Sequence, residues 1–528
     1  MTNPISDVLK SEVILAIGTN TTDNHPIIAN YVMEAIHQHG VDLLVIDPRR
    51  IELVDHATLW LRHNPGSDVA LINGFMHIII KEDLQDQAYI DERMEGFEEL
   101  KSCVEKYTPE YVSSITGISD EDLHAAARLY AKAEPAAILY TMGITQHITG
   151  TDNVKSCANL AMLCGNVGKE GGGVNPLRGQ NNVQGACDMG GLPNVFPGYQ
   201  AVTVDDVRKK FADAWGVEGF PSTPGITVTE MFSGGETGQI KALYVMGENP
   251  VLSDPDKHHI EKGIEGFEFF VVQDIFLTET AKLADVVLPA TCFAEKDGTV
   301  SNTERKVQRV RKAVEPPGEA REDTWIISEI AKRMGYTMPA STPEKIMEEI
   351  SLLTPSYKGI TYKRIEKGGI SWPCPDEDHP GTPVLHMGKF ARGKGLFFAI
   401  DYIPPAEPVD DEYPFLLSTG RNPQHFHTGT MTRRGTGLNR LCPEAIAEIN
   451  PVDAEELNIS GGEFIEITSR RGSIKVKVKL TERTQLGMVF MPFHFHEAPA
   501  NILTHSIVDP VAKIPEFKVS AVKINKAA

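Results

Sequence analysis

The chain has 528 residues, of which 41% are hydrophobic and 23% are charged, so several domains are expected, each with its own core. A formal net charge of −21 argues against nucleic acid or an anionic membrane surface as a partner. The sequence has no apolar run of about 18 residues that would span a membrane. No basic region precedes its first apolar stretch, so no signal peptide is indicated.

Seven cysteines are scattered along the chain, and no two form a C-x-x-C motif. Their spacing therefore indicates neither a zinc site nor an iron–sulfur cluster. Cys157 and Cys164 share one face of a helical pattern, where two core thiols are expected rather than metal ligands. Because free thiols suit a reducing compartment, a cytoplasmic location is expected, provisionally.

Residues 1–180 are predicted to form an α/β domain with a parallel sheet. VILAIG (13–18) is typical of a buried strand, a loop leads to a helix that starts at Pro26, and VDLLVIDP (41–48) is the next strand. Strand–helix–strand of this length is a βαβ unit. A helix at DVALINGFMHIIIKEDL, two helical stretches up to Ala133, a strand at AAILYTMG (136–143) and a helix ending near Leu163 follow.

Residues 181–292 are predicted to form a second α/β domain on the same plan. IKALYVMGENP (240–250) ends in Gly-Glu-Asn-Pro as the first strand ends in Gly-Thr-Asn, and FEFFVVQD (267–274) ends in an aspartate as VDLLVID does. A glycine there lets a ligand approach the backbone, and the acidic residue accepts hydrogen bonds from ribose or guanine. Any parallel sheet places such residues at strand ends, but two copies favour a cofactor with two nucleotide arms, or two cofactors. Neither copy has G-x-G-x-x-G, so a nicotinamide cofactor is not indicated.

Residues 293–405 are predicted to connect and cover the other domains. A strand in the stretch 284–310 is expected to lead into a polar loop that offers Thr299, Asn302, Glu304 and Arg305 to a ligand. TWIISEIAKRMG is helical in pattern. The acidic run 376–378 with His379 is expected to be a solvated loop rather than a metal site.

Residues 406–528 are predicted to form a β-barrel of double-psi type. YPFLLSTG, FIEITS, IKVKVKL and MVFMPF are short strands separated by turns, as in a barrel. His425 and His427 lie in the polar loop 420–434, where hydrogen bonding to an anionic ligand is expected rather than a metal pair. In FHFHEAPANILT, Asn501 is the expected polar contact.

The stretch Asn175–Gly190, NPLRGQNNVQGACDMG, holds a single cation and one carboxylate. The cation, Arg178, is followed by four side-chain amides, those of Gln180, Asn181, Asn182 and Gln184. Its composition predicts an ordered loop rather than a regular helix or a packed strand. A guanidinium meets a carboxylate with two parallel hydrogen bonds, so the loop suits a small planar anion. From composition alone, a surface loop whose amides cap neighbouring helices is an equal alternative.

Together, several stretches resemble the catalytic (alpha) subunit of formate dehydrogenase, in the molybdopterin oxidoreductase (dimethyl sulfoxide reductase) family. The stretches that carry the resemblance are LRGQNNVQGACDMG, IGTNTTDNHP, VIDPRR, MGENP, QDIFLTETAKLADVVLPA, HTGTMTRR and DPVAKIPEFKV. The first of these is specific for the formate branch. The resemblance implies reversible oxidation of formate to CO2, two molybdopterin guanine dinucleotides holding one molybdenum or tungsten, and an iron–sulfur electron-transfer subunit as partner.

The resemblance also implies site residues. Arg178 would be catalytic and would orient formate, and Gly179 and Gln180 would lie at the cofactor beside it. One pterin dinucleotide would be lined by Gly18, Asn20, Asp47, Arg49, Gly66, Asp68, Met142, Gly143 and Gln146. The other would be lined by Gly247, Glu248, Asn249, Gln273, Asp274 and Thr278. The residues closing over the pair would be Arg421, His427, Thr428, Asn501 and Lys518.

The sequence departs from the family pattern at its beginning. The family has four cysteines of a [4Fe–4S] cluster, a lysine and a metal-ligating selenocysteine or cysteine followed by histidine, and then a segment like MTNPISDV. The resemblance therefore implies that Met1 is an internal methionine and that the chain alone is inactive without this N-terminal portion, which would also carry any export signal. We hypothesise that an upstream UGA codon was read as stop; upstream DNA without an in-frame UGA-His or Cys-His pair would contradict this. A naturally split subunit is the competing explanation. Cys187 is expected to be a buried thiol rather than a substitute metal ligand.

Two other functions fit the same stretches. An oxotransferase of the same family would act on nitrate or a similar oxyanion, although the motif around Arg178 favours formate. A non-catalytic scaffold of an electron-transfer complex would keep the fold without the pterin, although the two nucleotide-binding plans argue against it.

Overall fold

The computed structural model describes residues 1–338 and 342–527. Residues 339–341, in the predicted connecting segment, and Ala528 lie outside the described residues. The chain divides into two compact units. Unit 1 comprises Met1–Leu177, Leu252–Lys257 and Val384–Ala528, and unit 2 comprises Arg178–Val251 and His258–Pro383. The division into four domains stays a prediction.

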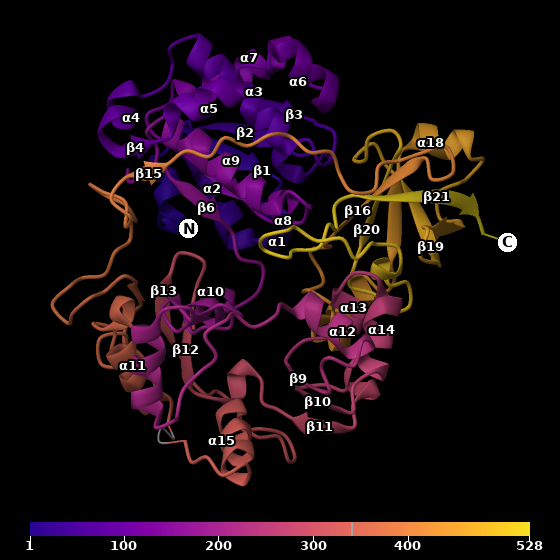
Figure 1. Ribbon diagram of the computed structural model, residues 1–528. Helices are drawn as coiled ribbons and strands as arrows, with labels where there is room; N and C mark the ends of the chain where they lie inside the picture. The colour runs from indigo at the N-terminus through magenta and orange to yellow at the C-terminus, as the bar shows by residue number, and fades with distance from the viewer. Residues whose placement is uncertain (339–341, 528) are drawn as a thin grey trace. The chain divides into compact units, whose positions relative to one another are not determined.

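Unit 1 contains a five-stranded parallel sheet in the order β3-β2-β1-β5-β6 (Figure 1). Alternate residues of its central strand β1 (Val13–Ile17) join two separate cores, one with α3 and α9 and the other with α2. Helices therefore bury both faces of the sheet, as parallel sheets require, and the predicted α/β fold is confirmed. The other strands are β2 Asp42–Ile46, β3 Leu59–Leu61, β5 Ala136–Tyr140 and β6 Val174–Pro176, with a small β4 Met94–Glu95 paired to β15 Gly395–Leu396.

The helices of this α/β part follow local capping signals. Helix α2 (Pro26–His39) has proline in its first turn and ends at Gly40 with φ +68°, as its sequence predicts. Four helices, not the two that were expected, lie between Lys81 and Ala133, because side chains cap three new starts, at Asp86, Thr108 and Ser119. The helices are η1 Ile5–Lys10, α1 Thr21–Asn24, η2 Glu52–His56, α3 Asp68–Lys81, α4 Gln87–Arg93, α5 Phe97–Val104, α6 Pro109–Thr116, α7 Asp120–Ala131, α8 Met142–Thr145 and α9 Gly150–Leu163.

Two glycines meet where β1 and β5 end. Gly18 has φ +54°, and its carbonyl oxygen accepts hydrogen bonds from the Gly143 N–H at 3.1 Å and the Thr141 hydroxyl at 2.8 Å. A Cβ atom on Gly143 would lie 2.5 Å from the Gly18 Cα. Two backbones therefore pack directly on each other at the edge of the sheet where the predicted nucleotide site lies.

Gly143→Ala is expected to lower the free energy of unfolding by about 1–3 kcal/mol, because the added methyl overpacks a contact in which neither backbone can retreat. Equilibrium unfolding in denaturant measures it. Gly219→Ala is the matched control, since a Cβ there meets nothing within 4 Å. Equal stability of the two variants would show that the Gly18–Gly143 contact is not tight.

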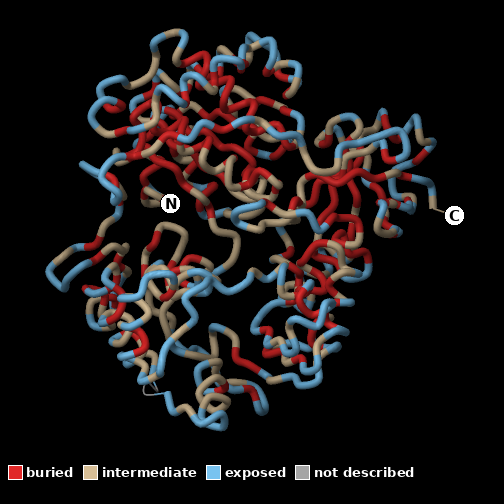
Figure 2. Tube along the Cα trace, in the orientation of Figure 1, coloured by how far each residue is buried: buried red, intermediate tan, exposed pale blue. Residues whose placement is uncertain are grey.

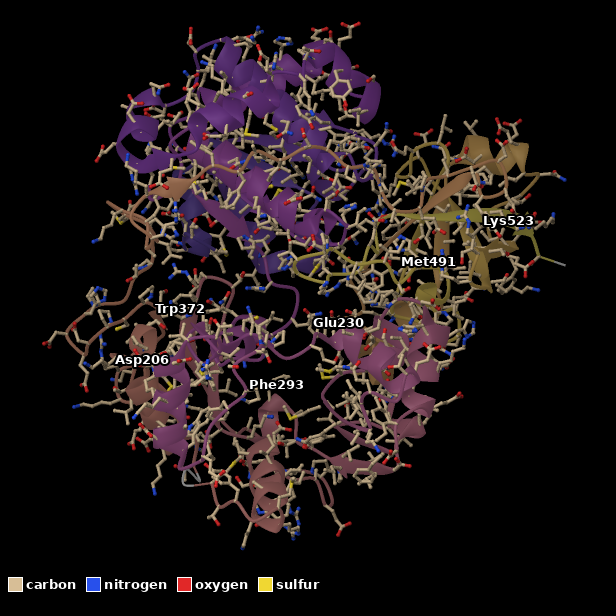
Figure 3. All side chains as sticks on the ribbon, viewed as in Figure 1. Asp206, Glu230, Phe293, Trp372, Met491 and Lys523 are labelled. Atoms are coloured by element: carbon tan, nitrogen blue, oxygen red, sulfur yellow. The ribbon has the colours of Figure 1, made fainter. Side chains whose placement is uncertain are left out.

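Unit 1 also contains the predicted β-barrel, which is confirmed as a closed barrel in the strand order β16-β20-β17-β19-β18-β21. Met491 on β20 marks it in Figure 3. The strands are β16 Phe415–Gly420, β17 Ile446–Ile449, β18 Phe464–Thr468, β19 Ser473–Leu480, β20 Met488–Pro492 and β21 Ser520–Lys526, with helices η6 Thr432–Arg434, α17 Thr436–Leu441, α18 Pro451–Glu456 and η7 Ala500–Ile502. The strands β17 and β21 were not predicted.

A buried ion pair joins the barrel to the α/β part of unit 1. The Arg49 guanidinium donates to Glu448 Oε2 from Nη2 at 2.7 Å and from Nε at 3.1 Å, and it stacks 3.7 Å from the ring centroid of Phe490. Backbone hydrogen bonds such as Arg50 N–H to the Arg483 carbonyl, at 2.8 Å, reinforce the junction. Arg49 is therefore fixed beside the end of β2, where Asp47 lies.

Unit 2 contains two three-stranded sheets, β11-β10-β9, which is parallel, and β12-β13-β14. The prediction of a polar loop after β11 is wrong in part, because the antiparallel hairpin β12–β13 forms there. The strands are β7 Val195–Phe196, β8 Gln200–Ala201, β9 Ala242–Met246, β10 Phe269–Asp274, β11 Val286–Pro289, β12 Gly298–Ser301, β13 Lys306–Val310 and β14 Ile370–Ser371. Helices between Arg178 and Pro383 are α10 Val183–Asp188, α11 Asp205–Trp215, α12 Val228–Glu236, α13 Pro250–Ser253, α14 Lys257–Glu265, η3 Ala281–Leu283, η4 Phe293–Glu295, α15 Asp323–Arg333, α16 Pro343–Leu353 and η5 Pro355–Tyr357.

Buried residues are densest along the strands of the α/β part of unit 1 (Figure 2). In unit 2, strands β9 and β11 are mostly exposed. Cys157 and Cys164 are buried core thiols, as expected, and burial raises the pKa of both, that of Cys164 to about 12. Across the described ranges 1–338 and 342–527, no helix has the length and apolar character to cross a membrane.

Candidate functional site

Arg178 is the first residue of unit 2, and it is half-buried. Its backbone N–H donates to the Thr303 hydroxyl at 3.1 Å, from the turn of the β12–β13 hairpin. Its Nε donates to Gln184 Oε1 at 3.4 Å. The guanidinium is thus held by a side-chain amide, while Gly179 and Gln180 continue as a half-buried turn. The geometry supports an anion-binding arginine on a fixed segment.

The expectation that Asn175–Gly190 is a loop is wrong in part, because Val174–Pro176 forms strand β6 and Val183–Asp188 forms helix α10. The helix begins after Asn182, whose φ of +61° turns the chain, and the Asn182 side chain accepts the Ser301 N–H at 2.9 Å. Tertiary hydrogen bonds therefore stabilise a helix that composition disfavours. Cys187 is half-buried, not buried as expected.

A cluster of cations surrounds Asp47 in unit 1. Burial lowers the pKa of Lys518 to about 8, the Asp47 charge opposes this shift, and the charges of Arg421 and Arg49 add to it. Burial lowers the pKa of Arg421 as well, and raises that of Asp47. Lys518 Nζ donates to the Thr419 carbonyl at 2.6 Å. Three cations, Arg49, Arg421 and Lys518, face two carboxylates, Asp47 and the Glu448 that pairs with Arg49. The cluster therefore keeps an excess of positive charge, which suits a phosphate or pyrophosphate.

Three polar residues, Thr19, Asn20 and Thr21, follow shortly after the end of β1, in the motif IGTNTTDNHP. Asn20 caps α1 and hydrogen-bonds Asp23 and Thr22. The hydroxyls of Thr19 and Thr21 are buried without a hydrogen-bond partner among the described residues. Buried hydroxyls left unpaired cost free energy, so these two are suited to a ligand group. Met142 opens α8, and Gln146 ends it, half-buried.

Gly66 and Asp68 have roles within the protein. Gly66 has φ +81°, and a Cβ there would lie 2.5 Å from Pro405 Cγ. Asp68 is buried, with Oδ1 3.2 Å from His63 Nε2 and Oδ2 3.8 Å from His147 Nε2. Burial alone would raise the pKa of Asp68, but the two histidines outweigh burial and lower it.

This buried chain continues through residues that were not predicted. His147 Nδ1 lies 3.7 Å from Glu516 Oε1, and His505 Nε2 lies 3.3 Å from Glu516 Oε2. Glu516 also accepts the backbone N–H groups of Ile148 and Ala406, at 3.3 and 3.1 Å. The motif DPVAKIPEFKV contains Glu516, but only contacts far along the chain give it this role.

The other predicted polar residues of the barrel region differ in their surroundings. Burial and then the Arg421 charge lower the pKa of His427 to about 4, so its imidazole is neutral at pH 7. The Thr428 hydroxyl pairs with that of Thr430 at 2.9 Å, and Asn501 Nδ2 donates to the Asp254 carbonyl at 2.7 Å. His425 is hydrogen-bonded to the Cys442 carbonyl at 2.6 Å, so it serves the loop itself.

In unit 2, Gly247 directly follows β9 with φ +67°, and a Cβ there would meet nothing within 4 Å. Of the other predicted residues, Glu248 is exposed and four have partners in the protein. Asn249 Oδ1 accepts from Thr280, and Gln273 hydrogen-bonds Tyr244 and Asp323. Asp274 Oδ1 accepts two backbone N–H groups, and the Thr278 hydroxyl accepts the Ala281 N–H at 3.1 Å. The strand end is therefore well ordered around an open glycine.

The acidic run 376–378 lies on the surface, and Arg305 makes contacts within the protein. Asp376, Glu377 and Asp378 are exposed, and Asp376 Oδ1 accepts the N–H groups of Asp378 and His379. Arg305 is buried and donates to the carbonyl oxygens of Trp372, Thr382 and Pro383. Within residues 1–338 and 342–527, His, Cys, Asp and Glu form no group of three or more suited to a metal ion.

Comparison with known proteins gives a consistent assignment. Residues 1–333 match the molybdopterin oxidoreductase family, and residues 415–521 match the molydopterin dinucleotide binding domain. The chain is 52% identical to the F420-dependent formate dehydrogenase subunit alpha of Methanocaldococcus jannaschii, over 100% of this chain and 78% of that protein. It is 41% identical to formate dehydrogenase H of Escherichia coli, over 100% and 74%.

A solved structure shows the same fold. Acetylene hydratase from Pelobacter acetylenicus superimposes with a TM-score of 0.78 at 21% identity, over 99% of this chain and 81% of that one. The parallel sheets and the closed barrel agree with the two family matches. The chain belongs to the molybdopterin oxidoreductase family, in which it is a homologue of formate dehydrogenase catalytic subunits.

Proposed function

We propose that this chain oxidises formate to CO2 as a formate dehydrogenase catalytic subunit, with Arg178 as the residue that binds formate. The reaction converts HCOO⁻ into CO2, one proton and two electrons. The observation that carries the proposal is the segment LRGQNNVQGACDMG, with its guanidinium held by Gln184, in a chain 52% identical to a formate dehydrogenase subunit.

Arg178 contributes orientation and charge. In formate the C–H bond points directly away from the two oxygens, so a guanidinium that binds both oxygens aims the C–H bond away from itself. The product CO2 is neutral, so its attraction to Arg178 is weaker than that of formate. The same arginine thus favours binding of the substrate and release of the product.

We propose further that the chain holds two molybdopterin guanine dinucleotides with molybdenum or tungsten. When bound, this group accepts the two electrons of the C–H bond. The fit in unit 1 rests on Arg49, Arg421 and Lys518, whose charges suit a pyrophosphate, and on the unpartnered hydroxyls of Thr19 and Thr21. Asp47 lies at a strand end suited to ribose or guanine.

For the second dinucleotide the proposal rests on unit 2. The open Gly247 lets a phosphate approach the backbone at the end of β9.

Two electrons must leave the enzyme after each turnover, and we propose an iron–sulfur subunit as their acceptor. The cytoplasmic location stays a prediction.

The test is turnover of the full-length enzyme, with its partners, on ¹³C-formate and a one-electron dye. We expect ¹³CO2 and two reduced dye molecules for each formate, together with molybdenum or tungsten by elemental analysis. Reduction of nitrate without oxidation of formate would establish the oxotransferase instead. Absence of both activities and of both metals would establish a scaffold.

A further inference from the structure

Asp188, the last residue of α10, is a fully buried carboxylate that accepts four side-chain hydrogen bonds. Gln184 Nε2 and the Tyr199 hydroxyl donate to Oδ1, each at 2.8 Å. The Tyr357 hydroxyl at 2.5 Å and Trp372 Nε1 at 2.7 Å donate to Oδ2. Trp372, labelled in Figure 3, marks the place of this cluster in unit 2. Four donors match the four lone-pair sites of a carboxylate, so the cluster is complete.

The donors around Asp188 keep their protons. Burial, and after it the Asp188 charge, raise the pKa of Tyr199 and of Tyr357 well above that of a free phenol. An indole N–H only donates. Asp188 therefore sits in a shell of fixed polarity, in which all four neighbours point a hydrogen toward it.

This polarity determines which way the Gln184 amide faces. Because a carboxylate only accepts, the end of the amide that meets Asp188 must be the NH2 group. Gln184 Nε2 also lies 3.1 Å from the Tyr199 hydroxyl. The amide oxygen then faces Arg178 Nε, at 3.4 Å. A buried charge is thus linked to the guanidinium through one amide whose orientation it sets.

We propose that Asp188 and Gln184 are positioning residues for formate, because Asp188 orients the Gln184 amide and the amide fixes the plane of the Arg178 guanidinium. The inference rests on the proposed role of Arg178. With Nε bound by Gln184, the two Nη groups are the pair that meets the carboxylate of formate. Neither Asp188 nor Gln184 touches formate.

Asp188→Asn gives a specific expected result. On the Oδ2 side, Trp372 can only donate, so the new amide keeps its oxygen there and turns its NH2 toward Gln184. Gln184 must then flip, which sets its own NH2 against Arg178 Nε. We expect the KM for formate to rise by about 10-fold to 100-fold, the range for losing a hydrogen bond to a charged group. The fall in kcat is expected to be smaller, because Arg178 keeps its charge.

Gln184→Leu removes the amide and is expected to raise KM similarly. Adding Asp188→Asn to Gln184→Leu should then raise KM no further, because Asp188 acts on Arg178 only through Gln184. Tyr357→Phe is the matched control, since it removes a donor to the same carboxylate from the side away from Gln184. It is expected to lower the melting temperature and leave KM within about 2-fold of wild type.

The test measures KM, kcat and the melting temperature of the full enzyme carrying each variant. Unchanged KM in folded Gln184→Leu, while Arg178→Lys loses activity, would overturn the inference and keep the proposed function. Gln184→Leu tests the same step even if Asp188→Asn does not fold. A rise in KM for Tyr357→Phe as large as for Asp188→Asn would show a general packing effect and also overturn it. A wild-type enzyme that does not oxidise formate would instead overturn the proposed function.

Discussion

Arg178→Lys is expected to lower kcat/KM for formate by about 100-fold to 1,000-fold, the range for removing one preorganised donor from an active site. Lysine keeps the positive charge but has no planar fork, so it cannot hold both oxygens of formate and aim the C–H bond. It also loses the Nε–H group that Gln184 accepts. Steady-state kinetics over a range of formate concentrations measure the change, and both kcat and KM are expected to be affected.

Arg128→Lys is the matched control for this substitution. Arg128 is half-exposed and donates to both oxygens of Glu82, at 2.8 and 2.7 Å, so the same chemical change is made at a surface pair. Surface pairs contribute about 0–1 kcal/mol, and neither turnover nor KM is expected to change. If Arg178→Lys behaved like Arg128→Lys, Arg178 would not bind formate.

Glu516→Gln is expected to lower the free energy of unfolding at neutral pH by about 3 kcal/mol. Burial alone would raise the pKa of Glu516, but His147, His505 and the Ala406 N–H outweigh burial and lower it from 4.5 to about 2. At about 1.36 kcal/mol for each pKa unit, this shift corresponds to about 3 kcal/mol. Both Glu516 oxygens accept a backbone N–H, so an amide would set its NH2 against one of them.

The stability difference between wild type and Glu516→Gln is expected to disappear at low pH. Because the pKa of Glu516 is lower in the folded state, its contribution is complete above about pH 4.5 and is lost as the pH falls toward about 2. Denaturant unfolding at several pH values is expected to show wild type and Glu516→Gln converging in this window. The control is Glu268→Gln, at an exposed pair with Lys241, which should cost at most about 1 kcal/mol. A constant difference between wild type and Glu516→Gln across the window would contradict the assignment.

Several elements follow from local sequence. Helix α2 is set by Pro26 at its start and Gly40 at its end, and the strands of the parallel sheet are set by apolar runs that fit burial on both faces. The strands of the barrel with alternating burial, such as β19, were predicted for the same reason. The motif around Arg178 is also local, since its residues are neighbours in the chain.

Other elements depend on partners far away in the sequence. Helix α10 lies in a segment with three glycines, and it forms where Asn182 accepts the Ser301 N–H. The β12–β13 hairpin was taken for a loop because its strands are short and polar, and its turn at Asn302–Arg305 needs φ +65° at Arg305. Strand β17 carries Glu448, a carboxylate that is buried where it pairs with Arg49, 399 residues earlier.

The α/β and barrel classes and the family could be predicted from the sequence, because periodicity, capping and contiguous motifs act between near neighbours. The same contiguous motif predicts Arg178 as the residue that binds formate. The contacts that hold these parts in place could be seen only in the structure. Asp188 meets Tyr357 and Trp372 across 169 and 184 residues, and Glu516 meets Ile148 across 368. A buried carboxylate is stable only when several donors converge on it, and that convergence exists in three dimensions and leaves no spacing in the sequence.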